Sequence, residues 1–488
     1  MPSAPQNKNL HDRATQGFMW SFTENFTGQG ITFLIGVILA RILSPREFGL
    51  IGMTGVVFAI IQTFVDSGFS QALIRRDKCT DSDYNTVFIF NLGVAVLLLG
   101  IVYWVAPFVA LFFSEGELSP IIRVLSISVI LYSLSIVQTT KLIKKLDFKT
   151  LAKISLGSSL VSGIIAVYLA YHGFGVWSLV WRLLISQFLS TSILWLHNRW
   201  MPHRGFDFVA FKELFTFGSK LLFASFINVV FDKANSIVVG RYYNPVTLGY
   251  YLRADQISNL PSSQITNVIQ RVSYPILVEL GNDLDRMRNG FRKLIQVSTV
   301  IIFPIMCGLS AVAEPFVLTL LGDRWSPCIL YLRIVSIAMM LYPLHAINLN
   351  VLNVKGRSDL FLRLEIIKKV VFIPVIAVGA FVGVLPMLWC FLAYSFFAFV
   401  INAYYTGCLI QYPIHEQIRD VSPVFILSGI MGLALFSVSI FLQIPEPIKL
   451  TILVIFGAIL YIILCELTKN QGYIQIKQMA LKMMRGLK

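Results

Sequence analysis

The sequence predicts an all-α polytopic membrane protein with about fourteen transmembrane helices. Of its 488 residues, 56% are hydrophobic, and the mean hydropathy is +0.74. Only 13% are charged, about half the usual share in a soluble domain. Apolar runs long enough to span a bilayer recur along the chain. A soluble protein of this composition would lack the polar residues to cover its surface, which excludes the soluble classes.

The charge balance is basic, and its placement indicates membrane topology rather than nucleic-acid binding. Forty Lys and Arg stand against 25 Asp and Glu, giving a net charge of +15. The basic residues lie in short gaps between apolar runs, so no nucleic-acid partner is expected. The six cysteines are widely spaced without a CxxC motif, and the six histidines show no metal spacing. We therefore expect no metal site and no cofactor.

Fourteen segments are apolar and long enough to cross a membrane, which takes roughly 20 residues each. They are 17–43, 49–74, 84–113, 119–140, 150–171, 175–197, 213–240, 248–278, 291–313, 327–351, 362–382, 386–410, 421–442 and 447–467. The first is too long for the core of a cleavable signal peptide, so we expect it to remain as a helix. An even number of spans places both termini on one side.

The loops between these spans alternate in composition. Residues 75–78 and 141–149 are rich in Lys and Arg, whereas 172–175 and 383–384 contain none. The exceptions are Arg46, Arg324 and Lys449. The positive-inside rule places the basic loops and both termini in the cytoplasm.

The C-terminal tail is basic and amphipathic. Between Ile476 and Leu487 apolar residues fall at helical spacing, with Lys477, Lys482 and Arg485 on the other face. This pattern predicts either a helix lying on the anionic inner leaflet or a helix packed on the protein.

An internal repeat has an offset of 200 residues. Arg41, Pro45 and Gly49 recur as Arg241, Pro245 and Gly249, and a small polar residue precedes each proline. Both copies close the first helix of a six-helix group, so we predict two lobes of the same orientation. Parallel repeats of this kind are typical of transporters, with the substrate path between the lobes.

The repeat also predicts how the chain is divided. We expect an N-terminal lobe of six helices over 1–205 and a C-terminal lobe of six helices over 206–411. Two extra helices follow over 412–468, and the cytoplasmic tail occupies 469–488.

Five stretches carry a resemblance to a known family. They are LARILSPREFGL (39–50), FVDSGFSQALIR (64–75), LGYY (248–251), RVSYP (271–275) and LGDRW (321–325). With these motifs the chain resembles the Wzx-type bacterial oligosaccharide flippases, such as those for O-antigen or colanic acid. These form the polysaccharide transporter branch of the multidrug/oligosaccharidyl-lipid/polysaccharide (MOP) exporter superfamily. The resemblance covers essentially the whole chain.

The resemblance implies a V-shaped, two-lobed exporter rather than an enzyme. It would move isoprenoid-pyrophosphate-linked oligosaccharide across the bacterial inner membrane by alternating access, for surface polysaccharide or lipopolysaccharide synthesis. Its partners would be that lipid-linked substrate, membrane lipids, and the polysaccharide polymerase and assembly machinery.

Polar side chains inside a membrane helix mark candidate sites because they are costly there. The segment 248–278 carries the clearest stripe, whose polar members are Arg253, Gln256, Gln264, Asn267 and Arg271. The two arginines are 18 residues apart, which is five full turns and about 27 Å in a straight helix. The stripe faces either water and substrate or neighbouring helices. We favour the first because two arginines are hard to bury dry.

The charge of the substrate suggests roles for the arginines. A pyrophosphate is densely negative, and planar guanidinium groups bind it bidentately. Arg271 near the cytoplasmic end is predicted to meet the substrate first, and Arg253 near the outer end to receive it afterwards. Arg41 and Arg241 at the outer ends of their helices are predicted to be interfacial, with a place in the lumen as the alternative.

Three other predicted helices carry shorter polar stripes. Asn25 and Asn228 are predicted to bind substrate, and Glu24, Asp66 and Asp232 are candidate sites for a coupling ion. Hydrogen bonding between helices is the alternative for all of them. The family resemblance implies that these helices and 248–278 line a shared central cavity.

Two rival functions follow from the same composition. A multidrug or small-metabolite exporter could use this scaffold, but cationic drugs favour a lumen rich in carboxylates, whereas the clearest stripe here is basic. A membrane polymerase or ligase typically presents a large outward loop, and the longest outward gap here, around 314–326, has only about a dozen residues. The chain contains no P-loop or GxSxG motif.

Overall fold

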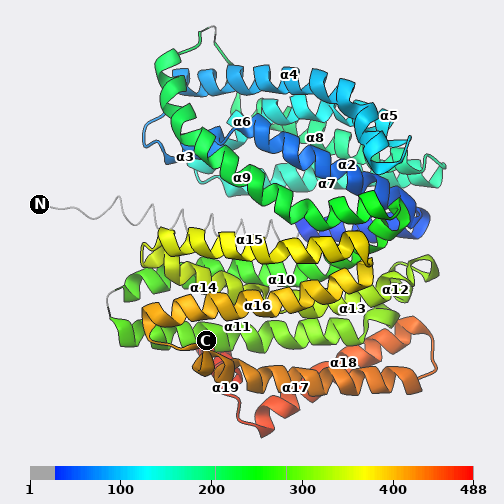
Figure 1. Cartoon of the computed structure of the whole chain (residues 1–488), viewed down its shortest axis with the longest axis vertical. Coiled ribbons are helices and arrows are strands. Elements are labelled where there is room, and N and C mark those ends of the chain that lie inside the picture. The colour runs from blue at the N-terminus through cyan, green and yellow to red at the C-terminus, as the bar shows by residue number, and fades with distance from the viewer. Residues whose placement is uncertain (1–27, 204, 282, 487–488) are drawn as a thin grey trace, which may run out of the picture. The chain divides into compact units, whose positions relative to one another are not determined.

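The computed structural model describes residues 28–203, 205–281 and 283–486, without the side chains of 271, 272, 275, 276 and 479–486. The described residues are almost entirely helical and include no strand (Figure 1). They divide into two compact units, Met1–Gly249 and Tyr250–Lys488. The all-α fold class predicted from composition is confirmed.

The first unit begins with a short apolar helix, Gly28–Ile42. Eight labelled helices follow: α2 (Pro45–Asp66), α3 (Phe69–Arg75), α4 (Asp81–Phe113), α5 (Leu118–Leu125), α6 (Ile127–Lys144), α7 (Phe148–Tyr171), α8 (Val176–Asn198) and α9 (Phe208–Tyr242). The helix α9 packs against α2, α3 and α4. The predicted second lobe begins with this helix, so the division into two six-helix lobes stays a prediction.

The helix α10 (Pro245–Leu280) starts in the first unit and continues into the second. The second unit then contains α11 (Leu284–Ala311), α12 (Ala313–Leu320), the 3₁₀ turn η1 (Asp323–Trp325), α13 (Cys328–Met339), α14 (Tyr342–Val354), α15 (Ser358–Phe381), α16 (Val384–Ile410), α17 (Ile414–Phe441), α18 (Glu446–Leu467) and α19 (Gln471–Gly486).

Eleven spans within the described residues are long and apolar enough to cross a membrane. They coincide with eleven of the fourteen predicted segments. Of the other three, Gly28–Ile42 is a shorter apolar helix, while α10 and α15 have 36 and 24 residues but carry more charge. Among the described residues, α10 and α15 are thus long helices with charged side chains along their length.

The two copies of the repeated motif begin helices in the same way. Ser44 is the N-cap of α2, where the Glu47 carboxylate accepts a hydrogen bond from the Ser44 N–H. Asn244 precedes α10, and its Oδ1 accepts from the Thr247 N–H at 2.8 Å. Each proline then occupies the first helical position, where its missing N–H costs nothing.

The copies also pack on each other, and all the residues involved belong to the first unit. A Cβ added to Gly49 would stand 1.7 Å from the Pro245 carbonyl oxygen, and one added to Gly249 would stand 2.0 Å from that of Pro45. We call this reciprocal contact the proline–glycine crossing. Because backbone meets backbone, only glycine fits at either position.

A break interrupts the first unit between α2 and α3. Ser67 and Gly68 adopt left-handed backbone conformations, with φ of 50° and 73°. Gly68 lies against α9, where an added Cβ would stand 2.4 Å from the Gly218 carbonyl oxygen. Asp66 caps the new helix, because its Oδ1 accepts from the Ser70 N–H at 3.2 Å and from the Ser70 hydroxyl.

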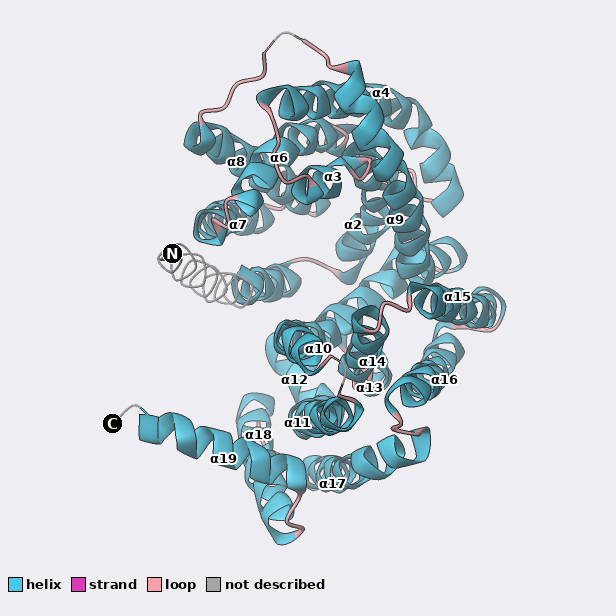
Figure 2. Ribbon diagram, turned by 90° about the vertical axis from the view of Figure 1, so that its left-hand side faces the viewer, coloured by secondary structure: helices cyan, strands magenta, loops and turns pink. Residues whose placement is uncertain are grey.

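In the second unit α11 is held to α17 by ion pairs. Arg288 Nη2 donates to both carboxylate oxygens of Glu416 at 2.7 and 2.6 Å. Arg292 Nη2 donates to Asp420 Oδ1 at 2.6 Å, and the Tyr412 hydroxyl donates to the other oxygen. Figure 2 shows α17 running beside α11, with α18 next to it.

The first turns of the tail helix pack on the second unit. Gly472 lies against the backbone of Gln296 on α11, and Gln475 Nε2 donates to Gln296 Oε1 at 3.3 Å. Lys477 forms an ion pair with Glu466 of α18. Of the two alternatives for the tail, packing on the protein therefore describes its beginning, while the side chains from Met479 onward lie outside the described residues.

Candidate functional site

Arg253 is the charged residue of the predicted stripe whose side chain the structure describes, and it is enclosed. Its side chain on α10 is 5% exposed, and Nη1 donates to Gln256 Oε1 at 2.6 Å. The guanidinium lies 5.7 Å from the centre of the Trp325 ring, which is itself fully buried. Tyr250 packs edge-on against the same ring at 6.0 Å. Within the second unit, Arg253 is therefore held by a hydrogen bond and a cation–π contact.

The remaining polar members of the stripe differ in exposure. Gln264 is buried at 8% exposure, whereas Gln256 is half-buried and Asn267 is exposed. The structure brings Arg253 and Gln256 into contact. Because the exposure differs along the stripe, its role in substrate binding stays a prediction.

Three predicted site residues cannot be placed. Glu24 and Asn25 lie outside the described residues, as does the side chain of Arg271. Their roles in ion coupling and substrate binding remain predictions from the sequence.

The acidic candidates that are described occupy different environments. Asp66 is half-buried at the break between α2 and α3, where it caps a helix. Asp232 and Asn228 are both exposed on α9 of the first unit. The Asp66 carboxylate thus has a structural role, because it accepts hydrogen bonds from Ser70. A bound ion would compete with these hydrogen bonds.

The paired arginines of the repeat are both exposed. Arg241 Nη1 donates to the Ser114 hydroxyl at 3.3 Å and its guanidinium lies 5.3 Å from the centre of the Phe112 ring. An arginine that holds a loop and an aromatic ring at a helix end suits the predicted interfacial position.

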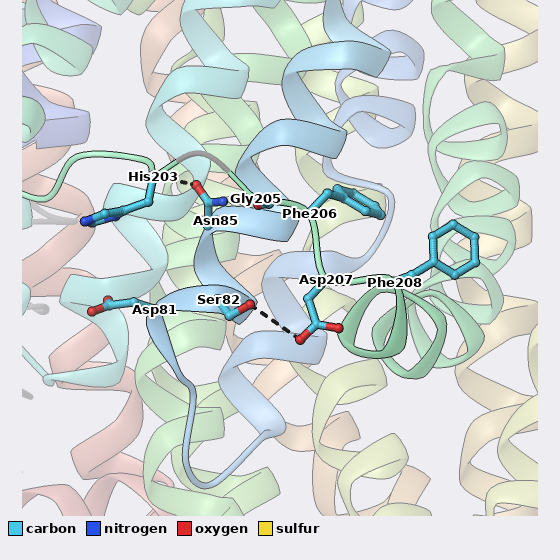
Figure 3. A pocket seen from close by; sticks show the side chains of 8 residues that line it. All are labelled: Asp81, Ser82, Asn85, His203, Gly205, Phe206, Asp207 and Phe208. Atoms are coloured by element: carbon cyan, nitrogen blue, oxygen red, sulfur yellow. Dashed lines mark hydrogen bonds between the residues drawn. The ribbon is translucent and has the colours of Figure 1, made fainter.

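A pocket of about 630 Å³ opens in the first unit at the start of α4. Its lining consists of Asp81, Ser82, Asn85, His203, Gly205, Phe206, Asp207 and Phe208. Asn85 Oδ1 accepts from the His203 N–H at 2.9 Å, and Ser82 donates to Asp207 Oδ2 at 3.4 Å (Figure 3). These hydrogen bonds tie the connection between α8 and α9 to the first turns of α4.

The sequence reasoning missed one intramembrane ion pair. Lys368 Nζ donates to Glu365 Oε1 within α15, in the first third of the predicted span 362–382. Their spacing of three residues on a predicted helix is a signal for such a pair. His345 on α14 belongs to no metal-binding spacing in the sequence, and in the structure it contacts Asn402 on α16.

The fold and these groups define a class: a multi-pass helical membrane protein with charged side chains inside its spans. A family model described as "Polysaccharide biosynthesis protein" matches residues 38–330, which is more than half of the chain. The chain belongs to that family of polysaccharide biosynthesis proteins.

Named relatives match over most of the chain. The teichuronic acid biosynthesis protein TuaB of Bacillus subtilis is 28% identical over 420 residues, covering 84% of this chain and 85% of that protein. The lipopolysaccharide biosynthesis protein WzxC of Escherichia coli is 22% identical over 377 residues, covering 76% of each. The succinoglycan biosynthesis transport protein ExoT of Rhizobium meliloti is 28% identical over 313 residues, covering 64% of this chain and 63% of that protein.

Solved structures share the fold. The lipid II flippase MurJ in an inward closed conformation superposes with a TM-score of 0.73 at 15% identity, covering 92% of this chain and 98% of that one. An inward-facing multidrug resistance MATE family transporter of the MOP superfamily gives 0.61 at 16% identity, covering 78% and 94%. The resemblance found in the sequence motifs is confirmed for the family and for the fold.

Proposed function

We propose that this protein is a flippase that moves isoprenoid-pyrophosphate-linked oligosaccharide across the bacterial inner membrane. The observation that carries the proposal is membership of the polysaccharide biosynthesis family. It is supported by relatives named for transport and for lipopolysaccharide synthesis, and by the fold shared with a lipid II flippase.

The proposed mechanism is alternating access with the proline–glycine crossing as its fixed point. The boundary between the two compact units falls directly after Gly249, the last residue of the crossing. A contact made of backbone on both sides has no long side chains to repack, so it suits a place about which helices turn. The α10 helix leads from this point to Arg253.

The environment of Arg253 is consistent with an anionic substrate. A guanidinium that is already oriented by Gln256 and Trp325 loses little entropy when it binds a phosphate. In this proposal Arg271 meets the pyrophosphate first and Arg253 receives it after the conformational change. The polysaccharide polymerase would take over the flipped substrate.

The proposed orientation has both termini in the cytoplasm. Arg46, an exception to the charge rule, pairs with Glu115 and Glu117 at 2.9 Å each, so the loop that contains it gains no net positive charge from that residue. A reporter that is active only in the periplasm, fused after Lys488, should be silent. Strong reporter activity would contradict the orientation.

The multidrug exporter is the second candidate, because the fold is shared with MATE transporters. A transport assay separates the two functions. Purified protein in liposomes should make the glycan of a lipid-linked oligosaccharide accessible to an impermeant glycosidase, faster than in protein-free liposomes. It should not accelerate the movement of a cationic dye. Transport of the dye without exposure of the glycan would favour the multidrug function instead.

A further inference from the structure

The pocket at the start of α4 is built on a fixed frame. Asn85 and Thr86 on α4 are 4% and 1% exposed. Asn85 Nδ2 donates to the Gly205 carbonyl oxygen, and its Oδ1 accepts from the His203 N–H. Thr86 Oγ1 accepts from the Asp207 N–H at 3.0 Å. Buried side chains of α4 therefore hold the backbone that forms the other wall, so the pocket exists before any ligand arrives.

The groups that line the pocket are of two kinds, which Figure 3 shows at opposite ends. Phe206 and Phe208 lie at one end. Their side chains are 41% and 72% exposed, and their ring centres are 6.2 Å apart. The Asp81 carboxylate and the His203 imidazole lie at the other end, and both are exposed. A ligand that fills the pocket therefore offers hydrogen-bonding groups to one end and apolar surface to the other.

Both carboxylates of the pocket are already compensated. Asp81 pairs with the Lys141 ammonium at 3.7 Å. Asp207 is the N-cap of α9, and its Oδ1 accepts from the Val209 and Ala210 N–H groups at 2.9 and 3.1 Å. This is the positive end of the helix dipole. Among the described groups of the pocket, neither carboxylate is an isolated negative charge, so a ligand needs hydrogen-bond donors but no positive charge.

These requirements fit a sugar. Sugar hydroxyl groups donate to carboxylate and imidazole acceptors. The C–H bonds on one face of a sugar ring carry a slight positive charge and pack on the negative face of an aromatic ring. An organic cation would need an uncompensated carboxylate, and a phosphate would need basic donors, whereas none of the described lining residues is Lys or Arg. The volume of about 630 Å³ suits a small-molecule ligand.

The position of the pocket suits a sugar that is attached to a membrane lipid. Asp81 precedes the predicted span 84–113 by three residues, and Asp207 precedes the predicted span 213–240 by six. At 1.5 Å per residue, both stand within about 10 Å of the apolar part of their helices. The proposed orientation places this end of α4 in the cytoplasm. The pocket therefore lies at the depth where the head group of a lipid in the inner leaflet is presented.

We propose that this pocket binds the glycan of the lipid-linked oligosaccharide on the cytoplasmic side, before the substrate is transported. The rings of Phe206 and Phe208 pack on the apolar face of one sugar, and Asp81 and His203 form hydrogen bonds with hydroxyl groups. The inference rests on the proposed flippase function. It adds a site for the sugar part of the substrate, whereas Arg253 is proposed to bind the pyrophosphate. Selection among glycans then begins outside the predicted spans.

Binding of a free oligosaccharide tests the proposal without transport. Mild acid releases the glycan from the lipid-linked oligosaccharide of the producing cells, and saturation-transfer NMR reports its binding to the purified full-length protein. Phe208→Ala should weaken this binding about fivefold, because a ring that packs on the sugar is lost. Asp81→Ala should weaken it as well, because an acceptor is lost. Matched controls in the second unit are Phe441→Ala at the end of α17 and Asp285→Ala in the first turn of α11, since both side chains are exposed.

The outcomes separate the glycan site from the flippase function. Wild-type affinity in both pocket variants, or no binding by the wild-type protein, would overturn the inference. Displacement of the oligosaccharide by choline would overturn it in favour of an organic cation. In the liposome assay, Phe208→Ala should raise the concentration of lipid-linked substrate at half-maximal rate about fivefold, and an unchanged value beside an active wild type would contradict the site. A wild-type protein that binds the oligosaccharide and transports nothing would count against the flippase function alone.

Discussion

The helices α2 and α10 begin with the same motif and then diverge. Both start at a capped proline and both pass through the proline–glycine crossing within their first five residues. The first then breaks at Ser67–Gly68, whereas the second continues through the equivalent positions Asn267 and Val268 for 36 residues. The two copies of the motif therefore share the contact between them, while the interiors of the two helices differ.

The interiors differ in charge as well as in shape. Asp66 stands at the break of the first helix and caps α3, while the second helix holds the enclosed Arg253. The break after α2 places the Asp66 carboxylate beside the backbone of the next helix. The unbroken α10 holds the Arg253 guanidinium on a continuous helix. The carboxylate of the first helix therefore stabilises a break in the chain, and anion binding is proposed only for the second helix.

The largest effect is expected at the crossing itself. Gly49→Ala or Gly249→Ala forces a Cβ into a carbonyl oxygen at 1.7 or 2.0 Å, which should destabilise the protein by about 3 kcal/mol or more. The measurement is thermal stability in detergent together with the yield of monodisperse protein. Gly55→Ala on α2 is the matched control, because its Cβ would meet open space. Equal stability of all three variants would show that the crossing tolerates side chains.

A smaller loss is expected at the break. Gly68→Ala must keep a φ of 73° and approach the Gly218 carbonyl oxygen at 2.4 Å. Strain of this kind costs of order 1 to 3 kcal/mol. The equivalent substitution Val268→Ala in the unbroken helix should cost less, since it requires no unusual backbone conformation. If Val268→Ala proved the more damaging in the same thermal assay, the contrast between the two helices would fail.

The smallest change in stability, with a clear change in transport, is expected for Arg253. Arg253→Ala should slow the completed flip by about tenfold or more, because a charge-assisted bidentate contact is lost, and should leave capture from the cytoplasmic side largely intact. Arg253→Lys should recover only part of the rate. Arg241→Ala, at an exposed helix end, is the control. Normal transport per folded Arg253→Ala molecule would remove this residue from the mechanism.

Sequence periodicity located the spans because each depends on a local run of apolar residues. It also located the repeat, since Pro45 and Pro245 share an offset with Gly49 and Gly249. It did not indicate that the two copies meet, because a spacing along the chain carries no information about which distant backbones touch. For the same reason Trp325, 72 residues beyond Arg253, was absent from the predicted site.

The ion pair on α15 and the contact between His345 and Asn402 were not predicted, for a different reason. Glu365 and Lys368 have the spacing of a helical ion pair, but two residues do not form a polar stripe of the kind that α10 carries. His345 and Asn402 are 57 residues apart, and only the packing of α14 on α16 joins them. When each of several helices contributes a single polar residue to a contact, none of their sequences shows a polar stripe.

The ion pairs between α11 and α17 bear on how the chain is assembled in the cell. Their members are 128 residues apart, so Arg288 and Arg292 are synthesised long before Glu416 and Asp420. Arg288, Glu416 and Asp420 lie outside the predicted spans 291–313 and 421–442, and Arg292 lies at the edge of one. Water can therefore solvate both arginines until the acidic residues are synthesised. The packing of α17 on α11 is thus completed by ion pairs that form late in translation, at the ends of the two helices.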